Sequence, residues 1–161
     1  MSKFKYTDKF LRTYGSQVEQ EIERRLASSG KEASGKLMQS IRYEVREKAN
    51  SIVIAFIMAD YGKYVDKGVQ GAESKRAGDG GKSIYKFKDK MPPAKSIKQW
   101  LKIKGIPESA SFPIRRSIYR FGITPTNFFT IPVTRRRKQL EQGLKENLIL
   151  DAEEIIKKEF K

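Results

Sequence analysis

The fold is decided by residues 34–68, which read SGKLMQSIRYEVREKANSIVIAFIMADYGKYVDKG. Residues 41–46 alternate apolar and charged side chains, which is the period of a half-buried strand. The Ala-Asn-Ser sequence at 49–51 favours a turn. Residues 52–58 are apolar at every position, which is typical of a central strand covered on both faces. In a chain this small, a second copy of the protein is one candidate for the second cover.

Two long amphipathic helices are expected on either side of this hairpin. Residues 7–28 carry an apolar residue at every fourth position, and residues 134–160 carry a second such stripe. The two stripes consist of Phe10, Tyr14, Val18, Ile22 and Leu26, and of Leu140, Leu144, Leu148, Ala152, Ile155 and Ile156. Shorter helical turns are predicted at residues 36–39 and 61–68. The expected fold is therefore α+β, with a small antiparallel sheet packed against long N- and C-terminal helices.

An insertion at about residues 70–122 is expected to add two helices to this single domain. Glycine and charged residues predict a loop over 68–82, followed by a short strand at 84–88. Paired prolines at 92 and 93 and a glycine at 105 bound one helix, and residues 113–121 form another. Two prolines and two aromatic residues favour an extended segment at 125–134.

Composition excludes several classes of chemistry. The 161 residues contain no cysteine and no histidine. Disulfides, Cys-type zinc sites, thiol nucleophiles, Ser-His triads and most transition-metal sites are therefore absent, and no cofactor is expected. The first ten residues lack the apolar run of a signal peptide. The longest apolar run, residues 52–59, is too short to span a bilayer, so no membrane role is expected.

Two local patterns suggest chemistry only superficially. Residues 78–83, GDGGKS, resemble a phosphate-binding loop, but Arg76 stands where the first glycine is required and no buried strand precedes it. Asp60 and Asp66 lie six residues apart, which does not place them on one helix face. The glycines are those of a flexible surface loop, and Lys63 and Lys67 are nearby ion-pair partners for the two acids. The sequence predicts no enzyme.

The net charge of +15 is concentrated in one part of the chain. Residues 75–138 contain 17 Lys and Arg against three acids, a net charge of +14. Such a region attracts nucleic acid, an anionic membrane surface or an acidic protein surface without choosing among them, or it forms a solvated face with no fixed ligand. No sequence-reading motif is present, so any contact with DNA would be nonspecific and made to the phosphate backbone.

The candidate contact residues lie away from the apolar stripes of their predicted helices or at the start of the last helix. Four cations at a helix N-terminus oppose the helix dipole, and an anionic partner would relieve that cost. The candidates are Lys95, Lys98, Lys102, Lys104, Arg115, Arg116, Arg120, Arg135, Arg136, Arg137 and Lys138.

Three segments resemble the tail-completion, or head–tail connector, proteins of tailed bacteriophages. Residues 34–41, SGKLMQSI, are similar to that family's T-G-x-L-x-x-S-I pattern, and residues 61–68, YGKYVDKG, to its Y-A-x-Y-V-E-x-G-T pattern. Residues 125–133, PTNFFTIPV, resemble its R-P-F-L-x-P-A stretch. The chain departs from the patterns at Ser34, Asp66, Val69 and Asn127, and residues 70–122 exceed the family's usual connection.

The resemblance implies a virion protein of the neck or tail, assembled in the host cytoplasm. Subunits would form a hexameric or dodecameric ring between portal or adaptor proteins and the tail, with the genome passing through it. The expected subunit-interface residues are Ile52, Ile54, Phe56, Tyr61, Tyr64, Phe128 and Phe129. The main alternative is a stand-alone basic protein that binds nucleic acid without sequence preference, and a metal-dependent nuclease is a more distant one.

Overall fold

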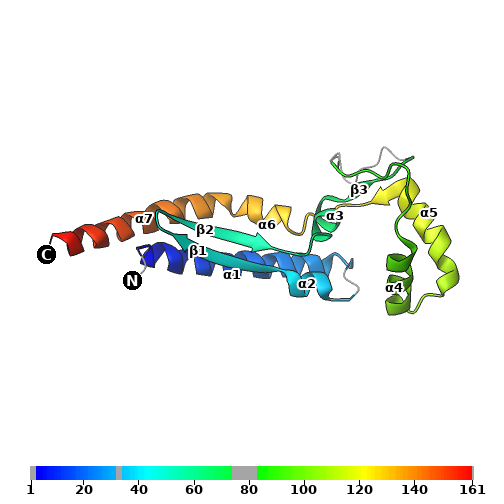
Figure 1. Ribbon diagram of the computed structural model, residues 1–161, viewed down its shortest axis with the longest axis horizontal. Coiled ribbons are helices and arrows are strands. Elements are labelled where there is room, and N and C mark those ends of the chain that lie inside the picture. Colours follow the sequence, from blue (N-terminus) through cyan, green and yellow to red (C-terminus); the bar gives the residue numbers. More distant parts are fainter. Residues whose placement is uncertain (1–2, 32–33, 74–82, 161) are drawn as a thin grey trace.

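The computed structural model describes residues 3–31, 34–73 and 83–160. It confirms the α+β fold: a two-stranded antiparallel hairpin packs against a long N-terminal and a long C-terminal helix (Figure 1). The elements, in chain order, are α1 (Lys5–Ser28), α2 (Lys36–Ser40), β1 (Arg42–Lys48), β2 (Ser51–Ile57), α3 (Gly62–Lys67), β3 (Val69–Gln70), α4 (Ala94–Lys104), the 3-10 turn η1 (Glu108–Ala110), α5 (Ser111–Phe121), β4 (Gly122–Ile123), α6 (Thr130–Arg135) and α7 (Arg137–Glu159).

The helix α1 forms the centre of the core. Its predicted apolar stripe faces inward: Tyr14, Val18, Ile22 and Leu26 are buried, and Phe10 is half-buried. Leu37, Ile41 and Phe128 complete the buried cluster. Fully burying an aliphatic side chain of this size contributes about 1.5–3 kcal/mol, so this one face of α1 supplies a large share of the stability.

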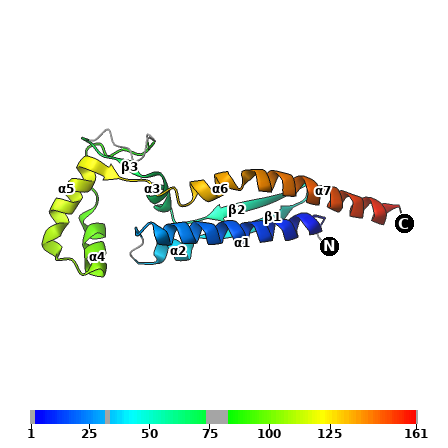
Figure 2. The same cartoon turned by 180° about the vertical axis from the view of Figure 1, so that it is seen from behind.

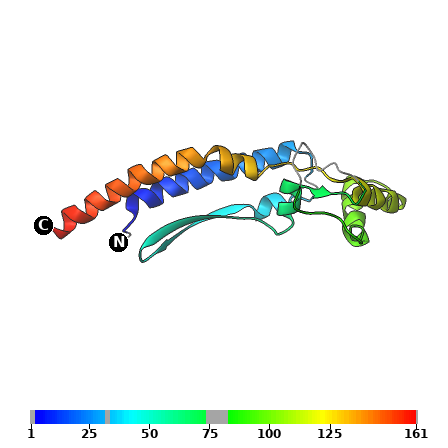
Figure 3. The same cartoon turned by 90° about the horizontal axis from the view of Figure 1, so that it is seen from above.

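The hairpin lies as a separate layer beneath the two long helices (Figure 3). Strands β1 and β2 pair over their whole length, with Tyr43 opposite Phe56 and Val45 opposite Ile54. Among the described residues β2 has no second strand partner. Ile54 and Phe56 pack on the core, whereas Val53, on the other face, is 44% exposed. The prediction of a central strand covered on both sides is therefore wrong within one chain.

The segment before the last helix is also not extended throughout. Residues 130–135 form α6, with Pro132 at its third position. A proline is tolerated in the first turn of a helix because the N–H groups there have no intrahelical acceptor. The helix α7 then begins at Arg137, after a break at Arg136, where φ is −89° and ψ is 3°.

The helices α1 and α7 run side by side (Figures 1 and 3). Gly143 of α7 sits directly against the ring of Phe10, which leaves no room for a side chain at 143. Near the other end of the contact, Asp151 accepts hydrogen bonds from the N–H groups of Tyr6, at 2.8 Å, and Thr7, at 3.0 Å. Asp151 thus caps the N-terminus of α1 from a different helix.

The insertion leaves and rejoins the body through the short antiparallel pair β3–β4, which we call the neck (Figure 1). Gly68 and Gly122 have φ values of 69° and 83°, and a Cβ atom at either position would lie 2.4 Å or less from a backbone oxygen of the paired strand. The predicted strand at 84–88 reduces to one parallel bridge between Gln70 and Lys86. Most of the phosphate-loop-like segment lies outside the described residues.

Beyond the neck, α4 and α5 pack against each other at one end of an elongated molecule (Figure 2). Helix α4 ends at Lys104, followed by Gly105 with φ of 67°, as predicted. Helix α5 begins two residues earlier than predicted, at Ser111, because η1 leads directly into it. No helix in the described part of the chain is long and apolar enough to cross a lipid bilayer.

Candidate functional site

Two of the three segments that carry the family resemblance, residues 61–68 and 125–133, meet at one buried carboxylate, Asp66. Its Oδ1 accepts hydrogen bonds from the N–H groups of Phe129, at 2.8 Å, and Thr130, at 3.1 Å, and its Oδ2 accepts one from the Thr130 hydroxyl at 2.5 Å. The Asp66 carbonyl accepts a further bond from the Asn127 N–H at 3.0 Å. Asp66 therefore caps α6 from α3, 63 residues earlier in the chain.

The first segment joins the same junction through Leu37 and Ser40. Leu37 packs against Gly62, where a Cβ atom would lie 3.0 Å from its methyl group. The Ser40 hydroxyl accepts a hydrogen bond from the Ala59 N–H at 2.9 Å. Residues 34–41, 61–68 and 125–133 thus form one contiguous unit, which we call the junction.

This geometry gives Asp66 a structural role. With three hydrogen bonds donated to its two oxygens and 2% exposure, the carboxylate is committed to the cap, although Asp66 borders an open pocket of about 360 Å³. Asp60 is exposed and takes no part in the hydrogen bonds around Asp66. Among the described residues, no group of three or more acids converges as a metal site would require.

The lysines of α4 all lie on the surface, with Lys95, Lys98 and Lys102 on one side of the helix and Lys104 on the other. Lys95, Lys98, Lys102 and Lys104 are all exposed, and Lys98 pairs with Glu108. Within the described ranges, Lys95, Lys102 and Lys104 have no acidic partner. These three charges remain available to an external anion.

The arginines of α5 are mostly engaged within the chain. Arg115 donates from Nε to the carbonyl of Pro92 at 2.8 Å, which ties α5 to the start of α4. Arg120 pairs with Glu73 at 2.5 Å and lies over the ring of Phe121. Arg116 is exposed and has no such partner in the part of the chain that the structure describes.

The four cations at residues 135–138 have acids of their own chain as partners. Arg136 donates from Nε to Glu21 at 2.9 Å, and Arg135 and Arg25 lie 3.8 and 3.5 Å from the same carboxylate. Arg137 pairs with Glu141 at 2.9 Å. The anionic partner expected for this cluster is therefore largely internal, and of the four only Lys138 has no acidic partner among the described residues.

Two groups where α1 meets the start of α7, Glu21 and Tyr14, have shifted pKa values. The hydrogen bond from Arg136, with the charges of Arg136 and Arg135, lowers the pKa of Glu21, whose side chain is 13% exposed. Burial raises the pKa of Tyr14, whose hydroxyl donates to the Arg136 carbonyl at 3.5 Å. These shifts follow from packing between α1 and the start of α7 and do not indicate a catalytic group.

The candidate subunit-interface residues divide into two groups. Phe128 is fully buried, and Ile54, Phe56 and Phe129 pack against the same core. Phe56 and Phe129 meet edge to face, with centroids 6.3 Å apart. Phe128 belongs to the core of its own chain, so assigning it to a subunit interface was wrong. Ile52 is half-buried near the hairpin turn.

Tyr61 and Tyr64, by contrast, are 46% and 39% exposed and line an open groove of about 740 Å³ beside the neck. Tyr64 contacts Tyr85 edge to face, with centroids 4.6 Å apart. The remaining wall comes from residues 84–88, α4 and α5. It includes Ile84, Phe87, Ile97 and Ile118. Lys86 and Lys88 are the charged residues in this lining, which we call the neck groove.

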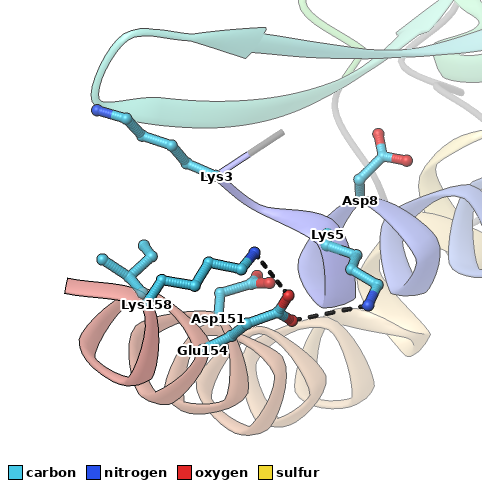
Figure 4. A pocket seen from close by; sticks show the side chains of 7 residues that line it. Lys3, Lys5, Asp8, Asp151, Glu154 and Lys158 are labelled. Atoms are coloured by element: carbon cyan, nitrogen blue, oxygen red, sulfur yellow. Dashed lines mark hydrogen bonds and ion pairs between the residues drawn. The ribbon is translucent and has the colours of Figure 1, made fainter. Parts of the chain in front are cut away.

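A smaller pocket of about 290 Å³ lies where the start of α1 meets α7. Figure 4 shows Glu154 between Lys5 and Lys158, at 3.7 and 2.8 Å, with Asp151 beside it. Asp151 is committed to the α1 cap, and the lysines neutralise Glu154. The pocket is therefore explained by the packing of the two helices.

The sequence reading missed one surface on α7. The stripe predicted to face inward does so only at its start, where Leu140 packs on the core. Leu148, Ile149, Ile155 and Ile156 are between 37% and 60% exposed, and Phe160 is 85% exposed. The distal part of the apolar stripe therefore does not form a face that is buried within the described part of the chain.

The chain was compared with protein-family models, with curated proteins and with solved structures. None of the three comparisons finds a match.

Proposed function

We propose that this protein is a non-enzymatic structural subunit of a tailed-bacteriophage virion, a tail-completion or neck protein that forms a ring around the DNA channel at the head–tail junction. The junction at Asp66 carries the proposal. Three segments that resemble the family at separate places in the sequence come together in one hydrogen-bonded unit, as expected if they were retained for a common scaffold.

The basic insertion supplies the contact that is particular to this chain. Residues 83–122 hold ten Lys and Arg against two acids and project from the body through the neck. Repeated around a hexameric or dodecameric ring, these charges would face either the phosphates of the passing genome or acidic portal, adaptor or tail proteins. Assembly would take place in the host cytoplasm, and the mature location would be the virion.

The test is the state of assembly. Mass photometry and negative-stain microscopy of the full chain, alone and with candidate portal and tail proteins, should reveal closed rings of six or twelve subunits. Particles that never exceed a dimer, even in the presence of those partners, would remove the basis for a ring subunit.

A stand-alone nucleic-acid-binding protein remains the second candidate, because Lys95, Lys102, Lys104 and Arg116 are exposed and unpaired within the described residues. That function requires the chain to bind duplex DNA as a monomer or dimer with a steep salt dependence. Ring formation without measurable DNA affinity would exclude it.

A further inference from the structure

We propose that the distal part of α7 from one copy of this protein docks in the neck groove of the next copy, so that identical chains join head to tail. The inference rests on the proposed ring function and names the two surfaces that would build the ring. Both surfaces are apolar and open in a single chain, and both belong to described residues.

The first surface is a stripe along the distal part of α7, residues 148–160. Leu148 and Ile155 are seven residues apart, and so are Ile149 and Ile156, which places the two neighbouring pairs on one side of the helix. Gly143, which is buried against α1, lies on the opposite side of the helix. Ile149 and Ile156 therefore point away from α1, whereas Ile155 borders the pocket where α1 meets α7. An amphipathic helix that docks in an apolar groove presents its anchor side chains on one face in this way.

The second surface is the neck groove. Its volume of about 740 Å³ and its aromatic and aliphatic walls suit several large apolar side chains of a docked helix. Ile84, on its edge, is 83% exposed, and Tyr61 is 46% exposed. Such exposure of large apolar side chains around one concavity marks an interaction site.

Charge selects a second copy as the occupant. On the distal half of α7, two acids, Glu146 and Glu159, have no Lys or Arg partner among the described residues, against one cation without an acidic partner, Lys145. Lys86 and Lys88 line the groove, and none of its described lining residues is acidic. The chain as a whole follows the same division, since residues 139–161 carry a net charge of −2 and residues 75–138 carry +14. Docking of α7 in the groove brings a segment of net negative charge against one of net positive charge. A contact between two basic insertions would instead be opposed by charge repulsion.

The shape of the molecule makes the contact intermolecular. The distal part of α7 lies at one end, beyond the start of α1, and the insertion lies at the other (Figures 1 and 2). A helix at one end therefore cannot reach the groove of its own chain. A contact between two different surfaces of identical subunits is heterologous, and it closes into a ring or continues as a filament.

Site-directed crosslinking tests this pairing, because the chain contains no native cysteine. Ile156→Cys on α7 and Ile97→Cys in the groove are made in separate full-length chains, mixed, and oxidised under the conditions in which the chain oligomerises. The matched controls are Leu150→Cys, which is 43% exposed but off the stripe, and Ile103→Cys, which is 53% exposed on α4 but outside the groove lining.

The mixed Ile156→Cys and Ile97→Cys chains should form a disulfide dimer in at least about tenfold excess over either control pairing, the ratio expected when a contact is preferred by about 1.4 kcal/mol. Both substitutions in one chain should give a covalent ladder that ends at the ring order. Equal crosslinking of test and control pairs would overturn the inference. Dominant dimers of Ile156→Cys alone would also overturn it and would indicate that α7 pairs with α7.

The outcomes separate this inference from the proposed function. Rings that form without the Ile97–Ile156 crosslink would reject the α7-to-groove contact and leave the ring function standing. Crosslinked chains that extend as open filaments would support the contact and reject a closed ring. A chain that stays monomeric at all concentrations, and in the presence of candidate portal and tail proteins, would reject both the α7-to-groove contact and the ring function.

Discussion

Asp66 stabilises the protein as a capping residue between distant segments. Replacing it with Ala would leave the N–H groups of Phe129 and Thr130 without their acceptor in a buried setting. Hydrogen bonds to a charged group contribute about 1.5–3 kcal/mol each on a net basis. Because the two N–H bonds together contribute about 3–6 kcal/mol, we expect Asp66→Ala to lower the free energy of unfolding by about that amount, measured by urea titration.

The matched control for this variant is Asp60→Ala, which removes an exposed carboxylate six residues away and should change stability by less than about 0.5 kcal/mol. An equal loss in both variants would indicate that Asp66 contributes through general charge and not through the α6 cap.

Glu21 links α1 to the start of α7 and makes stability depend on pH. Its pKa in the folded chain lies below its usual value of about 4.3, chiefly because Arg136 donates a hydrogen bond to it. The ion pair therefore contributes stability at neutral pH, and this contribution is lost as the pH falls through the folded-state pKa.

Glu21→Gln should consequently lower the melting temperature at neutral pH and flatten its decline between about pH 5 and pH 3. Thermal melts across that interval, with Glu141→Gln as an exposed control on the neighbouring Arg137 pair, give the measurement. Parallel curves for wild type and Glu21→Gln would show that Glu21 is not responsible for the acid sensitivity.

Neither carboxylate could be assigned its role from sequence. Asp66 was noticed as part of a motif and weighed as an acid, but its hydrogen-bond donors lie 63 and 64 residues away. Capping is readable from sequence when the cap and the helix are adjacent. A cap supplied by another helix leaves no local pattern.

At the level of elements, the hairpin has one face that supports the core and one that does not. Phe56 contacts both Tyr43 and Phe129, with centroids 6.5 and 6.3 Å apart. Phe56→Ala should therefore reduce the free energy of unfolding by about 3–5 kcal/mol, whereas Val53→Ala, on the exposed face, should cost less than about 1 kcal/mol. Urea unfolding of the two variants gives the comparison.

A large cost for Val53→Ala that grows with protein concentration would show that a second copy covers the outer face of the hairpin. That result would favour the two-sided strand expected from the sequence, with the second cover supplied in the assembly.

Periodicity predicted those elements whose partners lie within the chain. The stripe on α1, the alternation in β1 and the glycine after α4 were all read with nearly correct bounds. The predictions are wrong for α6, where Pro132 lies in the first turn, and for β2, whose all-apolar sequence predicts burial on both faces although one face is open in the described chain. The distal part of α7 shows the same limit of sequence periodicity. An apolar stripe indicates an apolar face but does not identify the surface that packs against it.

At the level of the whole molecule, much of the excess positive charge lies in the insertion, away from the hydrophobic core of the body. The body contains the packed core, and the insertion carries exposed cations that play no part in it. If these cations contact DNA, replacing Lys95, Lys102, Lys104 and Arg116 with Gln should reduce the slope of log affinity against log salt by about 3–4, near 0.9 for each phosphate contact.

The comparison variant for this experiment carries Arg135, Arg136 and Arg137 replaced with Gln. Because these arginines are paired with Glu21 and Glu141, this triple variant should lose stability while its salt slope changes little. Fluorescence anisotropy on a short duplex at several salt concentrations measures both slopes. The opposite ranking would place the DNA contact at the start of α7.

The neck has a consequence for how such a protein changes over evolutionary time. Because β3 and β4 are adjacent and antiparallel, the chain leaves the body and returns to it at nearly the same point. Everything between them is a cassette that can be lost, lengthened or exchanged without rerouting the scaffold, much as a loop between hairpin strands tolerates insertion. Lineages that share the body are therefore free to carry unrelated cassettes, each fitted to its own neighbours.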